Sequence, residues 1–170
     1  MSFTNAYPIH PKSALIELTL LNAEHIDENF DDLLIDSLKR NIPPEIATRL
    51  LELWTQTKIV AGEVVAIGKI IVRKIIDFLL NNPKMTIGIA IGAALSVLVA
   101  GIPYIGPLIA PLAAALSITY GAGVGSMMEN GIVSASPYTA AIEVASKFFE
   151  LLIHIFNGVT EYWNSKKQAS

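Results

Sequence analysis

The side chains that could carry out chemistry are few in this chain and lie far apart. The three histidines, His10, His25 and His154, share no spacing that would let two of them bind one metal ion. Cysteine is absent, which excludes disulfides, thiol catalysis and thiolate metal ligands. Ser126 does not stand in the Gly-x-Ser-x-Gly motif of a nucleophile. We therefore predict no enzyme activity, no catalytic residue, no metal ligand and no cofactor.

Two further segments have the composition of binding sites without the required spacing. Residues 121–125 read Gly-Ala-Gly-Val-Gly, but the Lys-Ser or Lys-Thr pair of a phosphate-binding loop does not follow. The acidic segment 24–36 lacks the glycine and the spacing of a calcium-binding loop, so a solvent-exposed face is expected there. A net charge of −3, with no long basic run, argues against nucleic acid as a partner. No small-molecule substrate is evident either.

The central segment from Met85 to Met128 contains no Asp, Glu, Lys, Arg or His. A membrane-spanning helix needs about 20 apolar residues, so the segment has room for two spans, 85–101 and 108–128. Prolines beside a glycine end a regular helix, and such a turn lies between the spans at Pro103, Tyr104, Gly106 and Pro107. This tip is uncharged, which favours its transfer across a bilayer. The sequence therefore predicts an apolar helical hairpin over 83–129.

Small residues recur at every fourth position along both arms of the predicted hairpin. They form two stripes: Gly88, Gly92, Ser96 and Ala100 in the first arm, and Ala113, Ser117, Gly121 and Gly125 in the second. Stripes of this kind let helix backbones approach closely in lipid, where apolar burial alone does not drive helices together. They could seal the two arms against each other or join neighbouring subunits, so we expect a homo-oligomer.

In architecture, residues 84–129 resemble the apolar hairpin of pore-forming colicins and other α-helical pore-forming toxins. Those proteins keep the hairpin buried in the soluble state and insert it later. The resemblance covers about a quarter of the chain and rests on the charge-free arms rather than on matched residues. It implies a toxin-like, membrane-inserting activity, and we infer no family membership from it. A hairpin that stays buried in a soluble bundle is the alternative.

The last predicted helix carries a narrow polar stripe on an otherwise apolar cylinder. We expect this helix over 136–163, with Ser136 as the N-cap and Pro137 at the first helical position. Six polar residues lie close to one line on its helical wheel: Glu143, Lys147, Glu150, His154, Asn157 and Glu161. In a ring of subunits the stripe could face an aqueous lumen, where its carboxylates would favour cations. Alternatively, it is the solvent face of the last helix.

The segments around the hairpin predict further helices. We expect an extended arm over 1–12, a soluble helical region over 13–82, and a C-terminal amphipathic helix with a short frayed tail over 136–166. Pro44 suits the first turn of a new helix. From Glu45 to about Leu80 the apolar spacing predicts one amphipathic helix of about 35 residues, about 50 Å long.

Together these elements predict an all-α fold in which long amphipathic helices flank a central apolar hairpin. The expected function is that of a membrane-active homo-oligomer whose hairpin inserts into a bilayer and forms a pore or permeabilises it. A hairpin-anchored membrane scaffold or remodelling protein is one alternative, and a soluble helical interaction module is another. We see no secretory signal, so synthesis in the cytosol followed by membrane association is expected. Arg73, Lys74 and Lys84 favour a cytoplasmic location for both ends of the hairpin.

Overall fold

The chain folds into a helical bundle with one short β-hairpin. The computed structural model describes residues 10–39, 41–120 and 136–160. Its elements in chain order are α1 (Pro11–His25), α2 (Phe30–Lys39), α3 (Pro44–Trp54), β1 (Lys58–Val60), β2 (Glu63–Val65), α4 (Ile67–Asn81), α5 (Ile87–Gly101), η2 (Pro103–Ile105), α6 (Gly106–Tyr120), α8 (Ser136–Phe148) and α9 (Glu150–Gly158). Helices dominate, which confirms the predicted all-α class.

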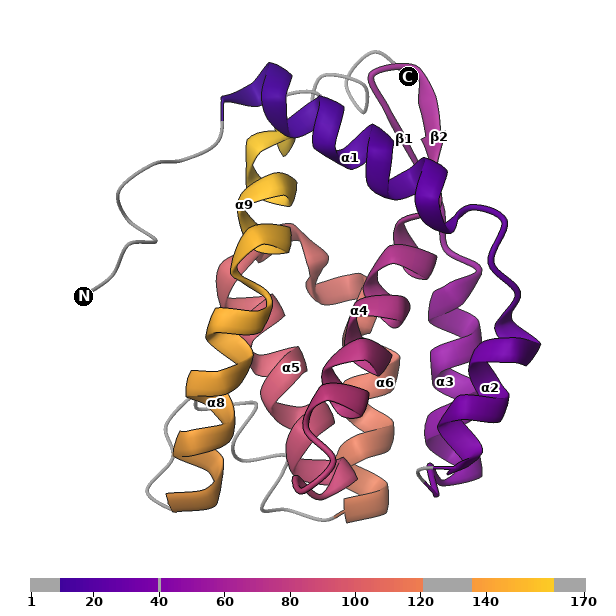
Figure 1. Cartoon of the computed structure of the whole chain (residues 1–170), viewed down its shortest axis with the longest axis vertical. Coiled ribbons are helices and arrows are strands. Elements are labelled where there is room, and N and C mark those ends of the chain that lie inside the picture. Colours follow the sequence, from indigo (N-terminus) through magenta and orange to yellow (C-terminus); the bar gives the residue numbers. More distant parts are fainter. Residues whose placement is uncertain (1–9, 40, 121–135, 161–170) are drawn as a thin grey trace.

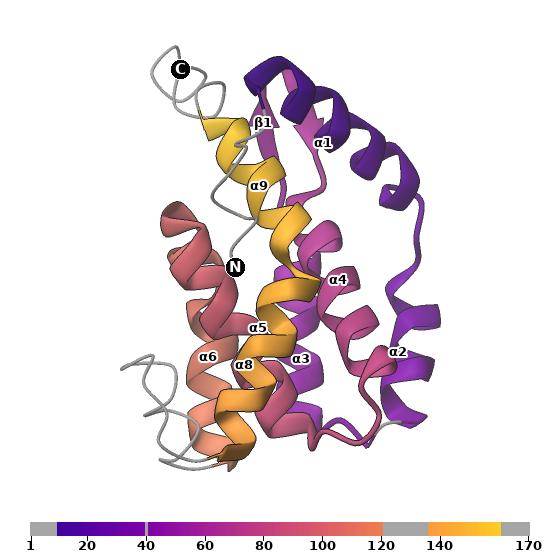
Figure 2. The same cartoon turned by 60° about the vertical axis from the view of Figure 1, so that its left-hand side comes forward.

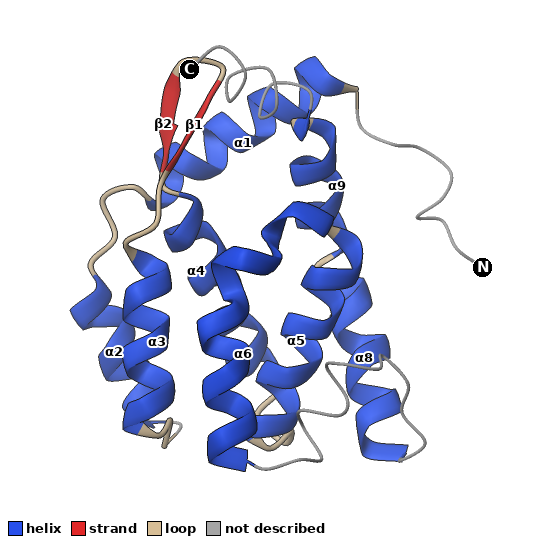
Figure 3. Ribbon diagram, turned by 180° about the vertical axis from the view of Figure 1, so that it is seen from behind, coloured by secondary structure: helices blue, strands red, loops and turns tan. Residues whose placement is uncertain are grey.

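Helix α5 lies at the centre of the bundle. It contacts α4, α6 and α8, which run alongside it (Figure 1). Helix α6 packs against α3 as well as α5, and it lies on the outside of the bundle when the molecule is seen from behind (Figure 3). Helix α1 crosses the end of the bundle and packs against α9 and α4 (Figure 2). The first and last helices therefore meet at one end of the molecule.

The starts of α1 and α3 follow from their local sequence. Helix α1 begins at Pro11, within the expected extended arm, because proline suits the first turn of a helix. The Nδ1 atom of His10 caps this turn by accepting a hydrogen bond from the backbone N–H of Lys12 at 3.1 Å. Helix α3 begins at Pro44, as the sequence predicts. Residues 1–9 of the expected arm lie outside the described residues.

The prediction of one long helix from Glu45 to about Leu80 is wrong. Helix α3 ends at Trp54, and an antiparallel β-hairpin separates it from α4. Ala61 and Gly62 form the turn of the hairpin with φ values of 53° and 85°. Two successive positive φ angles are typical of the tight turn that matches the twist of the flanking strands. Strands of three residues are too short for their alternation of buried and exposed side chains to be distinguished from helical spacing.

Contacts between distant residues hold the β-hairpin and the start of α4 in place. The side chain of Asn22 on α1 donates a hydrogen bond to Val64 O at 3.2 Å and accepts one from Ala66 N at 2.8 Å. Gly68 packs against the end of α3 so closely that a Cβ atom there would lie 1.7 Å from Leu53 O. The first turn of α4 therefore depends on a glycine where the chain doubles back.

The single C-terminal helix expected over 136–163 is interrupted. Helix α8 ends at Phe148 and α9 begins at Glu150, with Phe149 between them at φ −93° and ψ 2°. The rings of Phe148 and Phe149 both contact the ring of Phe78 on α4, at centroid distances of 5.3 and 5.5 Å. Neighbouring side chains on a regular helix point about 100° apart, and the break lets both rings reach one buried partner.

Candidate functional site: the apolar hairpin and its contacts

The structure contains the hairpin turn that the sequence predicts. Helix α5 ends at Gly101, the 3-10 turn η2 spans Pro103–Ile105, and α6 begins at Gly106. The second arm therefore starts two residues earlier than expected. Pro103 and Pro107 are exposed, Tyr104 and Gly106 are partly buried, and a Cβ atom added at Gly106 would meet nothing within 4 Å. The expected end of the second arm, residues 121–128, lies outside the described residues.

Most of the first arm, α5, is enclosed by the rest of the chain, although Val99, at 45%, and Ala100 are exposed. Most of its side chains are inaccessible to solvent, and five of them have no exposed area: Ala90, Ile91, Ala93, Ala94 and Leu98. A helix that is apolar on all sides has no favourable solvent face and has to be covered by other helices or by lipid. In this structure α4, α6 and α8 supply the cover.

The second arm, α6, has an apolar face in contact with solvent. Ile109, Leu112 and Leu116 point into the bundle and are buried. On the opposite side, the outer α6 face consists of four exposed apolar residues: Ala110, Pro111, Ala114 and Ile118. Ile118 is 84% exposed, the largest exposed fraction among the large hydrophobic side chains described. This face carries no charged residue.

Helix length distinguishes the two predicted spans. Within the described residues, the segment Pro103–Tyr120 is the one helix long and apolar enough to cross a membrane, judged by length and composition, and 28% of it is buried. Helix α5 has 15 residues and falls short of that length. Of the two predicted spans, only the second thus corresponds to a described helix of sufficient length, and the crossing of a membrane stays a prediction.

Different residues of the small-residue stripe on α5 face different neighbouring elements. Gly88 packs against the ring of Tyr120 on α6, and a Cβ atom at Gly88 would lie 2.9 Å from that ring. Gly92 is buried, whereas Ser96 and Ala100 line a groove between α5 and the pair α8 and α9. The stripe turns in this way because residues four apart on a helix differ by about 40° in direction.

The second stripe is described only in part. Ala113 and Ser117 on α6 are partly buried, whereas Gly121 and Gly125 lie outside the described residues. The role of both stripes in joining subunits stays a prediction.

The tip of the hairpin is joined to α9 by two hydrogen bonds, which we call the tip latch. The side-chain amide of Asn157 donates to Gly101 O at 2.7 Å. The hydroxyl group of Tyr104 donates to Phe156 O. The side chain of Ile153 packs against Gly101, where a Cβ atom would lie 2.8 Å from its Cδ1. One turn of α9 therefore holds the turn between the two apolar helices.

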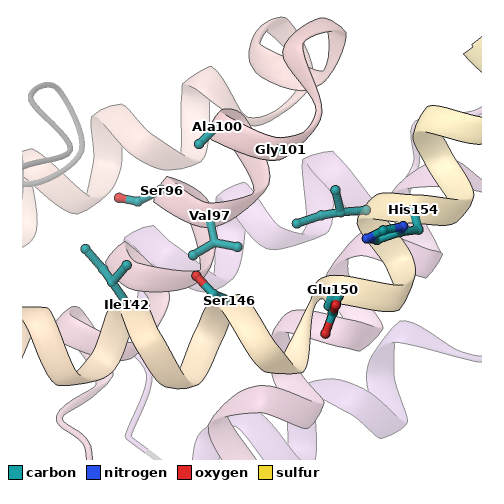
Figure 4. Close-up of a pocket in the computed structure, with 9 residues that line it drawn as sticks. Ser96, Val97, Ala100, Gly101, Ile142, Ser146, Glu150 and His154 are labelled. Carbon is teal, nitrogen blue, oxygen red and sulfur yellow. The ribbon is translucent and has the colours of Figure 1, made fainter. Parts of the chain in front are cut away.

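The polar stripe predicted on the last helix divides between two environments. Glu143 and Lys147 on α8 and Asn157 on α9 are exposed to solvent. Glu150 and His154 are partly buried and line the same groove as Ser96 and Ala100, so the structure brings the first small-residue stripe and the polar stripe together (Figure 4). Glu161 lies outside the described residues. The lumen interpretation of the stripe stays a prediction.

The titratable side chains of the described residues do not assemble into a metal site. No group of three or more His, Asp or Glu that could bind a metal ion occurs among them. His10 caps α1, and His25 is buried with its Nδ1 atom 3.0 Å from Oε1 of Glu28. These two histidines therefore have structural contacts, and His154 belongs to the groove.

Comparison of the chain with protein-family models, with curated protein sequences and with solved structures finds no match.

Proposed function

We propose that the protein permeabilises lipid bilayers by releasing the α5–α6 hairpin from its bundle into the membrane. The observation that supports this most directly is the asymmetry of the charge-free hairpin. One arm already exposes an apolar face to solvent, while the other arm is mostly enclosed and the tip is fastened by two hydrogen bonds. Stepwise insertion needs an apolar face that docks on the bilayer, a buried apolar arm that follows it, and a weak polar restraint that can break. The α5–α6 hairpin has all three.

The first step is docking of the outer α6 face on the bilayer surface. Transfer of a fully exposed isoleucine side chain out of water contributes roughly 1.5–3 kcal/mol, and Ile118 is 84% exposed. The alanines and proline beside it add a smaller apolar area. No charged residue belongs to this face, but Glu45 and Arg49 of α3 line a groove beside Ile118. Docking therefore has to leave these two side chains in water.

The second step is the exchange of the protein environment of α5 for lipid. The backbone polar groups in the interior of α5 are paired within the helix and keep their partners in hydrocarbon. Gly101 O, at the end of α5, loses its hydrogen bond from Asn157. Its contacts with α4 and α8 are lost and replaced by contacts with lipid and with α6. A helix of 15 residues is about 22 Å long, against a hydrocarbon core of about 30 Å. Spanning therefore requires local thinning of the bilayer or extension of α5 into its flanking apolar residues.

The third step is association of released hairpins. In the bundle, Gly88 of the α5 stripe packs against Tyr120, and Ser96 and Ala100 face the groove towards α8 and α9. Release uncovers the stripe and makes it available to the hairpins of other copies. A cluster of such hairpins would perturb the bilayer enough for solutes to pass.

A disulfide that fastens the hairpin to α9 tests the proposal directly. The chain has no native cysteine, so the double variant Gly101→Cys with Ile153→Cys contains a single cysteine pair. A Cβ atom at Gly101 would lie 2.8–3.1 Å from three side-chain carbons of Ile153, which leaves the two Cβ positions within the span of about 3.5–4.5 Å that a disulfide bridges. The oxidised variant should release no dye from phosphatidylcholine vesicles, and reduction should restore release.

The matched control joins the two arms to each other instead of to α9. Gly88 and Tyr120 are equally close, with a Cβ atom at Gly88 lying 2.9–3.2 Å from three ring carbons of Tyr120. The oxidised pair Gly88→Cys with Tyr120→Cys should still release dye, because the hairpin can leave the bundle as a unit. Equal dye release by both oxidised variants, or no release by the wild-type chain, would disprove hairpin insertion.

A soluble helical interaction module is the second candidate, and the enclosure of α5 favours it. In that case the outer α6 face binds a protein and the hairpin never leaves the bundle. Flotation of the wild-type chain with phosphatidylcholine vesicles in a density gradient separates the two candidates, because a soluble module remains at the bottom.

A further inference from the structure

The groove between α5 and the pair α8 and α9 has the size and the lining of a small-molecule site. Its volume is about 410 Å³, within the range of roughly 300–1,000 Å³ usual for ligand pockets. Four apolar side chains form much of its wall: Val97, Ala100, Ile142 and Ile153. In the close-up, Ile142 and Ser146 of α8 point towards Ser96 and Val97 of α5 across the groove (Figure 4).

One carboxylate determines the charge of the groove. Glu150 is the only acidic residue in its lining, which contains no lysine or arginine. Within the described part of the chain, no hydrogen bond or ion pair involves the Glu150 side chain, although it is partly buried. A partly buried carboxylate beside apolar side chains attracts a cation that can donate hydrogen bonds.

A second polar group in the lining also lacks a partner. The Oγ atom of Ser96 is buried and has no hydrogen-bond partner, and an unpaired buried hydroxyl group is destabilising unless a ligand or water satisfies it. Ser146 and the imidazole of His154 complete the polar part of the lining. The polar groups are few and lie among apolar side chains, as in sites that bind amphipathic molecules.

We infer that this groove binds a small amphipathic amine, with its apolar body on Val97, Ala100 and Ile153 and its ammonium group on Glu150. The carboxylate repels an anion, so phosphates and fatty acids are excluded as ligands. The groove would bind such an amine whether or not the hairpin inserts into lipid, so binding is measured in lipid-free buffer. The sequence alone indicates no small-molecule partner, because the lining combines α5 with two helices that lie more than 40 residues further along the chain.

Three probes with the same apolar body and different head groups test the inference on the full chain. Hexylamine, hexanol and hexanoate carry a cationic, a neutral and an anionic head at neutral pH. Backbone amide shifts in NMR titrations give the dissociation constant of each probe and its location. We expect hexylamine to bind at least about tenfold more tightly than hexanol, because a hydrogen bond to a charged partner is about twice as strong as a neutral one. Hexanoate should bind most weakly, and the shifts should cluster around Ser96, Ala100 and Glu150.

Two variants and one control assign the effect to the groove. Glu150→Gln should reduce hexylamine binding to the level of hexanol. Ala100→Leu should weaken binding of both probes, because Ala100 is exposed at the groove and leucine fills it without replacing a core residue. Glu143→Gln removes the same charge from an exposed position outside the lining and should leave both dissociation constants unchanged.

The opposite results would overturn the inference. Equal binding of hexylamine and hexanol, or no saturable binding of either, would exclude an amine site. An effect of Glu143→Gln as large as that of Glu150→Gln would show that the overall charge of the protein, not the groove, attracts the amine.

Discussion

The tip latch depends on two side chains, and each contributes one hydrogen bond to the stability of the bundle. A single intramolecular hydrogen bond typically contributes about 0.5–1.5 kcal/mol to stability. Asn157 is exposed, so water competes for its amide group, and Tyr104 is partly buried. The two bonds together form a weak restraint compared with the packing of α5 in the core. We expect them to control how often the tip leaves α9 more than whether the bundle folds.

Removal of the Asn157 side-chain amide should therefore accelerate insertion at little loss of stability. For Asn157→Ala we expect a decrease of about 1 kcal/mol in the free energy of unfolding and severalfold faster dye release from phosphatidylcholine vesicles. Urea unfolding and a stopped-flow dye assay measure the two effects. Asn81→Ala is the matched control, because Asn81 also donates a side-chain hydrogen bond to a backbone carbonyl, on α4 and away from the tip. If both variants release dye at the same rate, the latch has no role in release.

At the scale of elements, α5 and α6 show how helices of similar composition acquire different environments. Both are apolar and uncharged along their described length. Helix α5 has helices on several sides, whereas α6 packs only its Ile109, Leu112 and Leu116 side inwards. The outer α6 face is consequently the part of the hairpin that meets lipid first in the proposed mechanism.

A charge on the outer α6 face should block docking while leaving the fold intact. For Ile118→Glu we expect a change in unfolding free energy within about 0.5 kcal/mol, as for other exposed positions, and a loss of vesicle binding in flotation. Val64→Glu on β2 is the control, because Val64 is also an exposed apolar residue, at 56%, and lies on the β-hairpin. Retained flotation of Ile118→Glu would mean that another surface docks on the membrane.

At the scale of the whole molecule, the hairpin belongs to the same core as the other helices. One cluster of buried residues extends from α1 through α5 to α9. Release of α5 would therefore uncover apolar side chains on α4 and α8, so the bundle and the inserted state exclude each other. Gly88 and Gly92 of the α5 stripe are likewise buried within their own chain before release.

The oligomeric state should consequently depend on lipid. In lipid-free buffer we expect a monomer of 18.3 kDa, and after reconstitution into phosphatidylcholine nanodiscs a multiple of that mass. Size-exclusion chromatography with multi-angle light scattering measures both. The oxidised Gly101→Cys, Ile153→Cys variant should stay monomeric with lipid, because its stripe cannot be uncovered. A stable oligomer in lipid-free buffer would contradict this order of events.

Local sequence was sufficient to predict the hairpin turn and two helix starts, because proline fixes φ and lacks a backbone N–H whatever surrounds it. Pro103 and Gly106 mark the turn, and Pro44 and Ser136 mark the starts of α3 and α8. The prediction of one helix from Glu45 to Leu80 was wrong because strands of three residues are too short to show a periodicity of two. The break at Phe149 has no local sequence signal, because it reflects the packing of this side chain on Phe78.

The sequence by itself determined that residues 85–128 need a largely apolar environment, because they contain no charged residue. Only the tertiary structure decided how that requirement is met: α5 is covered by α4, α6 and α8, while α6 keeps one face exposed. The tip latch and the amine groove also depend on the tertiary structure, because each brings α5 next to α8 or α9 across more than 40 residues of chain. Composition sets the preference for an apolar environment, but contacts between distant segments decide which surface remains open.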